Sequence, residues 1–496
     1  MKKIVLLMIV VLTIVLTGCT KDNPVEPAIQ TELKKAFPRH GNYYQVFVRS
    51  FADSDNDGIG DINGITENLD YLEDLGVNGL WLMPIHPSPS YHGYDVDDYY
   101  AINEDYGTLE DFDRLVDEAD KRGINIIIDL VMNHTSNHHE WFIDHPEWYT
   151  SFSYFGAWMP ELDYSKPEVR DAMLQVMKYW LDKGVSGFRV DAAIHLFNSK
   201  TYVNGLPATA DIKQTVDYYT MLRAQLRKDY PELYLVGEVW ASKDYTASFY
   251  QGFDSLFNFD YSTKVIDTVT SSNVSNYGST INGYYRSFQN IMDSYNARFV
   301  NSNEIYIDAP FIKNHDQDRT ASLINDTENV FAAEMLLALP GNPYVYYGEE
   351  LGMKGVSSNG TNNVWDETRR LPFLWGTEDQ TNWCTACVDY NKEVKPLSEQ
   401  KVNESSLYNT YKTLLNLRND YPALMYGTFE LVDNDLSNVD VFKRTIVFGD
   451  YSQEVWVYHN FSNVSVNIDT TGYEVIYNTN HTDELEPMSS IYMVKK

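Results

Sequence analysis

The sequence predicts an α/β protein built on a TIM-type (β/α)8 barrel, with a small inserted domain and a C-terminal all-β sandwich. Two observations predict this architecture, one for the barrel and one for the sandwich. Apolar runs with strand character alternate with amphipathic helical segments from about residue 43 to residue 420, and such alternation is typical of parallel sheets. A change after about residue 425 to short alternating strands predicts the sandwich.

Eight runs rich in β-branched and aromatic residues supply the expected barrel strands. They cover residues 43–51, 77–85, 124–134, 186–193, 233–240, 255–260, 309–316 and 343–351. Helical segments lie between them, such as 108–123 and 171–184, and each of these two ends in a Gly suited to the residue after a helix. Eight strands with intervening helices fit a closed barrel better than an open doubly wound sheet. We therefore assign residues 36–425 to the barrel domain.

Two further domains are expected from changes in composition. Residues 135–180 are rich in His, Trp, Tyr and Pro, which predicts a small domain inserted after the third strand. Residues 426–496 form the expected sandwich, with strand-like runs at 427–432, 440–447, 454–461, 464–468, 473–478 and 490–494. The hydrophobic content of 43% is enough to build a large core.

The N-terminus has the pattern of an export signal. Lys2 and Lys3 precede an apolar run from Ile4 to Leu16, which is short for a transmembrane helix. The following "LTGC" resembles the bacterial lipoprotein box, in which Cys19 becomes the lipidated first residue of the mature chain. Residues 1–19 are thus expected to be a lipoprotein signal peptide and 20–35 a polar tether. The protein is expected to be exported and lipid-anchored to a bacterial membrane, facing outside the cytoplasm; the alternative is an ordinary signal peptide with an incidental Cys.

Charge and cysteine content narrow the class of protein. The formal net charge of −33 argues against a nucleic-acid partner, because polyphosphate would be repelled. We interpret most of this negative charge as a contribution to solubility; the alternative is that it binds cations. After Cys19 only Cys384 and Cys387 remain, too few for a zinc site of about four ligands, so a local disulfide is expected between them.

Polar residues cluster where the predicted barrel strands end, which is where barrel enzymes place their chemistry. Because strand side chains alternate between faces, Arg189 and Asp191 point the same way. The polar residues at the ends of the third, fourth, fifth and seventh strands are Asp129, Asn133, His134, Arg189, Asp191, His195, Glu238, Trp240, Asn314, His315 and Asp316.

Three of these carboxylates suit glycoside hydrolysis, which needs one carboxylic acid and one carboxylate flanking the scissile bond. Asp191 beside Arg189 is expected to have a lowered pKa, as suits a nucleophile. Glu238 lies in the apolar "YLVGEVW" and is expected to have a raised pKa, as suits a general acid. Asp316 would hold sugar hydroxyls and the developing positive charge. The alternative is a set of buried structural ion pairs.

Four segments together resemble the α-amylase superfamily of retaining glycoside hydrolases: "DLVMNH" (129–134), "GFRVDAAIH" (187–195), "GEVW" (237–240) and "FIKNHD" (311–316). The resemblance covers nearly all of the mature chain. It implies Asp191 as the nucleophile, Glu238 as the general acid/base and Asp316 as the stabiliser of the transition state. It also implies a substrate-binding set, in which Tyr94 of "YHGYDVDDY" stacks on the −1 sugar: Tyr94, His134, Arg189, His195, His315 and Arg370.

A loop near the N-terminus of the barrel has the pattern of a cation site. "DSDNDGIGD" places acidic side chains at alternate positions, and hard oxygen ligands of this kind suit Ca²⁺. The expected ligands are Asp53, Asp55, Asp57, Asp61 and the carbonyl of Ile59, and similar loops bind Ca²⁺ in the α-glucosidase-like branch of the resembled superfamily. The alternative is a solvated acidic turn.

The resemblance also bears on specificity. Ala192 resembles the α-1,4-acting members, whereas Ile194 replaces a Lys often found there, and "MPELDY" (159–164) departs from the oligo-1,6-glucosidase branch. We expect a monomeric, α-amylase-like enzyme that cleaves starch and maltooligosaccharides internally, with some transglycosylation. The alternatives are an α-glucosidase or cyclomaltodextrinase-type enzyme and, from another class, a non-catalytic surface protein that binds glucans.

Overall fold

The computed structural model describes residues 27–197, 202–203, 206–241, 243–270, 289–290, 293, 306–361, 364–377, 379–480 and 484–496. The expected signal peptide with the lipidation site Cys19 lies outside these residues, so the lipid anchor and the export that depend on it stay predictions. Within the described ranges no helix combines the length and the apolar composition needed to cross a bilayer.

A parallel sheet closes into the predicted (β/α)8 barrel. Its strands run in the order β8-β7-β4-β3-β2-β1-β9. Residues 309–311 fill the seventh place as single bridges, from Ala309 to Phe257 and from Phe311 to Tyr344, instead of a continuous strand. Pro310 lacks the N–H that a full ladder needs at this position. The strands are β1 (Tyr43–Val46), β2 (Gly79–Leu82), β3 (Asn125–Leu130), β4 (Gly187–Val190), β7 (Tyr234–Gly237), β8 (Ser255–Leu256) and β9 (Tyr344–Tyr346).

Aromatic rings fill the inside of the barrel below the strand ends. The ring of Tyr43 lies between those of Tyr234 and Tyr344, with centroids 5.1 and 4.9 Å away. Gly79 on β2 permits this packing, because a Cβ there would come within 2.4 Å of the Tyr43 ring. The filled interior makes the barrel a rigid support for the side chains that follow each strand.

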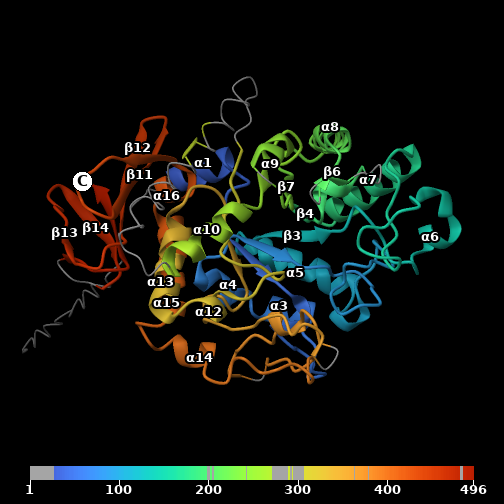
Figure 1. Cartoon of the computed structure of the whole chain (residues 1–496), viewed down its shortest axis with the longest axis horizontal. Helices are drawn as coiled ribbons and strands as arrows, with labels where there is room; N and C mark the ends of the chain where they lie inside the picture. The colour runs from blue at the N-terminus through green and yellow to red at the C-terminus, as the bar shows by residue number, and fades with distance from the viewer. Residues whose placement is uncertain are drawn as a thin grey trace, which may run out of the picture.

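Helices surround the barrel, as Figure 1 shows. Helix α5 begins with a capping box between Thr108 and Asp111 and buries Phe112 and Leu115. The helices are α2 (Val48–Phe51), α3 (Ile62–Glu67), α4 (Leu69–Leu75), α5 (Leu109–Lys121), α7 (Pro167–Asp182), α8 (Thr209–Leu226), α9 (Lys243–Phe249), α10 (Phe259–Thr270), α12 (Thr320–Leu323), α13 (Asp326–Ala338), α14 (Leu397–Gln400), α15 (Leu407–Asp420) and α16 (Pro422–Tyr426).

The inserted domain follows β3 and ends earlier than predicted. It contains α6 (Glu140–Asp144) and a bridge that joins Tyr149 to Leu162. Helix α7, which the sequence analysis partly assigned to the insertion, belongs to the barrel: its Trp180 is buried and donates to the backbone carbonyl of Tyr99 (2.8 Å). A short hairpin of β5 (Tyr202–Val203) and β6 (Leu206–Pro207) follows β4.

The C-terminal domain is the predicted all-β unit, seen in red at one end of the molecule in Figure 1. A five-stranded antiparallel sheet in the order β10-β11-β12-β16-β14 accompanies a two-stranded sheet of β13 and β15. Buried Glu334 on α13 ties the barrel to this domain by accepting from Ser490 (2.7 Å) and Tyr477 (2.7 Å). The strands are β10 (Thr428–Val432), β11 (Val439–Phe448), β12 (Tyr451–Asn460), β13 (Val466–Asn467), β14 (Tyr473–Asn478), β15 (Glu484–Leu485) and β16 (Ser489–Lys495).

Part of the segment predicted as a tether is folded. Residues Pro27–Ala36 form helix α1, whose Leu33 is fully buried. Phe37, just after the helix, stacks on Tyr426 at the end of α16 with ring centroids 5.2 Å apart. An apolar contact of this kind outweighs the polar character of the segment, so any free tether is shorter than the predicted 20–35.

Candidate active site

Arg189 on β4 is the centre of the polar cluster at the strand ends. Its side chain is 1% exposed and its guanidinium reaches three carboxylates: Asp129 (2.8 Å), Asp191 (2.6 Å) and Glu238 (3.0 Å). The rings of Trp81 and Tyr94 lie on it, 5.1 and 5.7 Å from the guanidinium carbon. One cation therefore holds carboxylates from three adjacent strands in a fixed arrangement.

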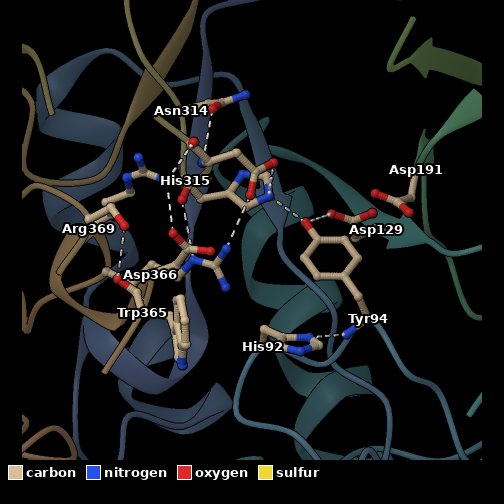
Figure 2. Close-up of polar contacts among 12 residues, drawn as sticks. His92, Tyr94, Asp129, Asp191, Asn314, His315, Trp365, Asp366 and Arg369 are labelled. Carbon is tan, nitrogen blue, oxygen red and sulfur yellow. Dashed lines mark hydrogen bonds and ion pairs between the residues drawn. The ribbon is translucent and has the colours of Figure 1, made fainter. Parts of the chain in front are cut away.

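A chain of hydrogen bonds runs from β1 across the site to Asp129 (Figure 2). Gln45 donates through Nε2 to Nδ1 of His315 (2.7 Å), which leaves the proton on Nε2 of that ring. This Nε2 faces the hydroxyl of Tyr94 (2.7 Å), and the hydroxyl donates to Asp129 (3.0 Å). Tyr94 and His315 also lie parallel, at an interplanar angle of 11°. The predicted stacking residue is thus held by both a ring contact and hydrogen bonds.

Asp316 contacts the same ring nitrogen of this histidine as Tyr94 does. One of its carboxylate oxygens is 3.1 Å from His315 Nε2, and the other accepts from Arg370 (3.2 Å). The neighbouring Arg369 donates to the backbone carbonyl of Asp316 (2.9 Å). The structure therefore brings Arg370, which the resemblance implied, directly to the third carboxylate.

The residue after Asp191 has an unusual backbone conformation, which allows its N–H to donate to Glu238. Ala192 has a positive φ of 45°, which an L-residue adopts only at a cost in free energy. This conformation directs its backbone N–H to a carboxylate oxygen of Glu238 (3.1 Å). Backbone strain at this position thus fixes the predicted acid relative to the predicted nucleophile.

Burial dominates the protonation of these carboxylates. It raises the pKa of Asp191 and Glu238, and that of Asp129 to about 7, while Arg189 lowers all three. The expectation that Arg189 would bring the pKa of Asp191 below its ordinary value is wrong, because the raising effect of burial outweighs the lowering effect of this cation. Burial also raises the pKa of Asp316, but His315 and the arginines outweigh it and bring the pKa below its ordinary value.

The shifts have opposite directions: the pKa values of Asp129, Asp191 and Glu238 are raised and that of Asp316 is lowered. Three carboxylates around one arginine carry excess negative charge, so the cluster retains a proton to higher pH than isolated acids would. Glu238 has its raised pKa in the direction that a general acid needs. The roles predicted for the two residues need Asp191 ionised and Glu238 protonated. The pH–rate profile expected from these roles falls at low pH as Asp191 gains a proton, and at high pH as Glu238 loses one.

The two remaining predicted histidines lie toward the inserted domain. His134 is buried beside Asn133, and burial lowers its pKa to about 4, so the ring is neutral at pH 7. His195 follows β4 and stacks on Tyr154 of the insertion, with ring centroids 4.6 Å apart. His195 therefore joins the inserted domain to the segment after β4 that carries Asp191, the predicted nucleophile.

Aromatic side chains also lie exposed beyond the buried cluster. Trp240 follows Glu238 in the segment after β7, is 56% exposed and stacks on Phe259 with ring centroids 4.5 Å apart. Tyr154 of the insertion and Trp365, which Figure 2 shows beside Asp366, are exposed as well. Flat amphipathic rings held open to solvent are suited to the faces of sugars.

The acidic loop converges on one point. Carboxylate oxygens of Asp53, Asp55 and Asp61 lie within 4.8 Å of one another. The carboxylate of Asp57, a fourth predicted ligand, is not part of this group and accepts from the backbone N–H of Ile59 (2.7 Å). Three converging carboxylates are a donor set that fits a hard cation such as Ca²⁺.

Two supporting residues were missed as site residues. Gln45 and Trp81 lie in apolar runs on β1 and β2. Gln45 donates to His315 (2.7 Å), and Trp81 donates to Asp129 (3.3 Å). Their position in predicted strands was the available signal, since a polar group inside an apolar run needs a partner.

Comparisons with known proteins agree with this geometry. The model of the family described as alpha amylase, catalytic domain, matches residues 45–155 and 144–427. Alpha-amylase 3 of Dictyoglomus thermophilum is 35% identical over 457 residues, which cover 85% of each chain. A probable oligo-1,6-glucosidase of Bacillus subtilis is 30% identical and covers 81% of this chain and 87% of its own.

A solved structure leads to the same conclusion. The alpha-amylase from H.orenii superposes with a TM-score of 0.79 at 35% identity, covering 92% of this chain and all of the other. The family match spans the barrel that carries Asp191, Glu238 and Asp316. The chain therefore belongs to the alpha-amylase family and is a glycoside hydrolase.

Proposed function

We propose that the protein hydrolyses internal α-1,4-glucosidic bonds of starch and maltooligosaccharides with retention of configuration. The contact of Asp191 and Glu238 with one guanidinium, that of Arg189, carries this proposal. Retaining glycosidases hold their two carboxyl groups about 5 Å apart, closer than inverting enzymes, which need room for a water molecule. A shared guanidinium favours this shorter separation.

The reaction proceeds in two displacements. In the first, a carboxylate oxygen of Asp191 forms a bond to the anomeric carbon while the bond to the glycosidic oxygen breaks. Glu238 gives its proton to that oxygen, and the shortened glucan leaves as an alcohol. Asp316 and the neutral His134 face the sugar, and the ionised Asp316 stabilises the developing positive charge.

In the second displacement, the Glu238 carboxylate takes a proton from water, and the water oxygen attacks the same carbon. The bond to Asp191 breaks and the nucleophile is released as a carboxylate. A sugar hydroxyl in place of water gives transglycosylation by the same steps. The two inversions together retain the anomeric configuration.

The names of the relatives are compatible with two specificities, that of an α-amylase and that of an α-glucosidase. Alpha-amylase 3 and the H.orenii enzyme are named alpha-amylases, whereas other relatives are named oligo-1,6-glucosidase or maltase. Ala192 and the exposed rings of Tyr154, Trp240 and Trp365 favour a long α-1,4-glucan. An α-glucosidase or cyclomaltodextrinase-type activity is the second candidate, favoured by the acidic loop that resembles the α-glucosidase-like branch.

The time course of products separates these candidates. We expect soluble starch to give mixed oligosaccharides early in the reaction, with the α-anomer appearing first by NMR. Maltooligosaccharides of defined length serve as the control, since they show which bonds are cut. Glucose alone from the start would favour the α-glucosidase, and an initial β-anomer would contradict the retaining mechanism.

We also propose that the acidic loop holds Ca²⁺. Asp53, Asp55 and Asp61 supply carboxylates, and the Ile59 carbonyl remains a proposed further ligand. The ion would balance three converging negative charges. It would also fix a loop whose Asp53 already accepts from the backbone N–H groups of Asn56 (2.7 Å) and Gly58 (2.8 Å).

Removal of calcium is expected to lower the melting temperature by several degrees, because the converged carboxylates then repel one another. The measurement is metal content by mass spectrometry with thermal melting, before and after EDTA. Asp55→Asn should weaken calcium binding, while the matched Asp57→Asn, outside the converged group, should retain it. If EDTA changed neither the metal content nor the melting temperature, the calcium proposal would be wrong.

A further inference from the structure

The segment from Asp379 to Cys387 lies between the acidic loop and the catalytic pocket. Its Asp379 carbonyl accepts from the backbone N–H of Asp53 (3.1 Å), and its Asn382 N–H donates to the Gly58 carbonyl (2.9 Å). Gly58 has a φ of 95°, and a Cβ there would lie 2.4 Å from the Asn382 side chain. Glycine therefore permits the close approach of these two segments.

Trp383, the next residue, points from this segment toward the pocket. Its ring stacks on Tyr91 with centroids 5.5 Å apart and an interplanar angle of 20°, and its edge contacts Phe47 at 5.8 Å. Its indole N–H donates to the hydroxyl of Ser50 (2.6 Å). That buried hydroxyl in turn donates to the backbone carbonyl of Arg370. Trp383 is thus held by stacking, edge packing and a hydrogen bond.

The groups that Trp383 contacts are the ones that hold the side chain of Arg370. The guanidinium carbon of Arg370 lies over the ring of Tyr91 at 5.6 Å and over that of Phe47 at 6.0 Å. The same guanidinium donates to Asp316 (3.2 Å). Movement of the Tyr91 ring would therefore move the arginine that contacts the third catalytic carboxylate.

A disulfide closes the turn immediately after Trp383. Cys384 and Cys387 are bonded to each other, as the sequence predicted, and the Cys387 N–H donates to the Cys384 carbonyl (3.2 Å). A covalent link across so short a turn limits the backbone conformations open to the adjacent residue. The cross-link thus restricts how far Trp383 can move away from Tyr91.

We propose that Trp383 is a positioning residue for catalysis: it holds Tyr91 and the Arg370 backbone, and so keeps the Arg370 guanidinium against Asp316, while the Cys384–Cys387 disulfide fixes the turn that presents the indole. This inference needs only the glycoside hydrolase activity of the family. Its failure would leave the proposed α-1,4 specificity untouched, since that rests on the product profile.

Steady-state kinetics on a maltooligosaccharide tests the positioning role. Trp383→Ala is expected to lower kcat about 10- to 100-fold, because small displacements of a transition-state contact have effects of this size, and to change KM less than about twofold. Trp383→Phe keeps a ring for stacking and should retain kcat within about threefold. The matched control is Trp456→Ala, which removes a half-buried indole hydrogen-bonded to Glu454 in the C-terminal domain and should leave kcat unchanged.

A double-mutant cycle shows whether Trp383 acts through Arg370. In an Arg370→Lys background, Trp383→Ala should lower kcat by no more than about twofold, because coupled residues are not additive. Full additivity would overturn the proposal, as would an unchanged kcat in folded Trp383→Ala. A rise in KM alone would also overturn it, since that would make Trp383 a direct sugar contact. Should Trp383→Ala not fold, Trp383→Leu takes its place with the same expectations.

The role of the Cys384–Cys387 disulfide is tested separately, by kcat of a variant that lacks it and of the reduced wild type. The Cys384→Ser/Cys387→Ser variant is expected to lose about threefold in kcat, which would support a fixed turn as the source of the positioning. Wild-type enzyme treated with a reductant should lose the same factor, and the double variant should then be insensitive to reductant. An unchanged kcat in the double variant would overturn the role assigned to the disulfide.

Discussion

Replacement of Glu238 by Gln is expected to lower kcat by about a thousandfold or more while glucan binding is retained. General acid–base catalysis alone contributes about 10²–10⁴-fold, and the amide cannot donate the proton that the leaving oxygen needs. The amide oxygen can still accept from the Ala192 N–H, so the local fold is preserved. The measurements are initial rates on starch and maltooligosaccharides, with binding followed by calorimetry.

A matched control for Glu238→Gln is the same substitution at Glu232, a nearby glutamate in the sequence. Glu232 lies exposed just before β7, at the opposite end of the strand that leads to Glu238, so Glu232→Gln makes the same change in charge away from the site. This control should keep wild-type kcat. Should the wild type itself release no sugar from starch, maltotriose, pullulan or cyclodextrin, a glucan-binding function would replace catalysis.

The barrel and the gathering of its polar residues at one site could be predicted from the sequence, because both rest on local patterns. Alternation of strands and helices follows from hydrophobic periodicity. Asp129, Arg189, Glu238 and Asn314 each belong to a predicted strand end. Because the carboxyl ends of parallel strands meet at one rim of the barrel, these residues and the polar residues next to them were expected to lie there together. Six predicted substrate-binding residues lie in or beside this rim, and Arg370 reaches Asp316 from a segment far along the chain.

Features that depend on long-range packing could not be predicted from the sequence. The seventh strand is reduced to two bridges around Pro310, and α1 folds because Leu33 and Phe37 find apolar partners that are far away in the chain. The pKa of Asp191 could not be judged from its neighbour Arg189 alone. Its direction depends on burial and on two further carboxylates that share that arginine.

Replacement of Arg189 by Met is expected to lower the free energy of unfolding by about 3–5 kcal/mol at pH 7 and to abolish activity. Methionine keeps much of the apolar contact with the rings of Trp81 and Tyr94, but removes the cation. Loss of one partner of a buried ion pair has an effect of this size, because the remaining charges stay buried without compensation. Denaturant unfolding followed by fluorescence measures the change.

The pH dependence of this loss identifies its cause. Without Arg189 the pKa values of Asp129, Asp191 and Glu238 rise further above their unfolded values, so the folded state binds protons more tightly than the unfolded state. Stability is then lost as pH rises through the folded pKa values and is regained as pH falls. The difference between Arg189→Met and wild type should therefore be larger at pH 8 than at pH 5.

Arg444 provides the matched control for the loss of a buried arginine. It is fully buried, but its guanidinium donates to backbone carbonyls of Ala338 (2.8 Å), Gly427 (2.9 Å) and Thr428 (3.1 Å), and no ion pair to a carboxylate is recorded for it in the described part of the chain. Arg444→Met should destabilise the protein by nearly the same amount at pH 5 and pH 8, since carbonyls do not titrate. An equally flat profile for Arg189→Met would assign its effect to lost packing and hydrogen bonds, and would contradict the role of Arg189 as the cation that lets three catalytic-site carboxylates share one buried pocket.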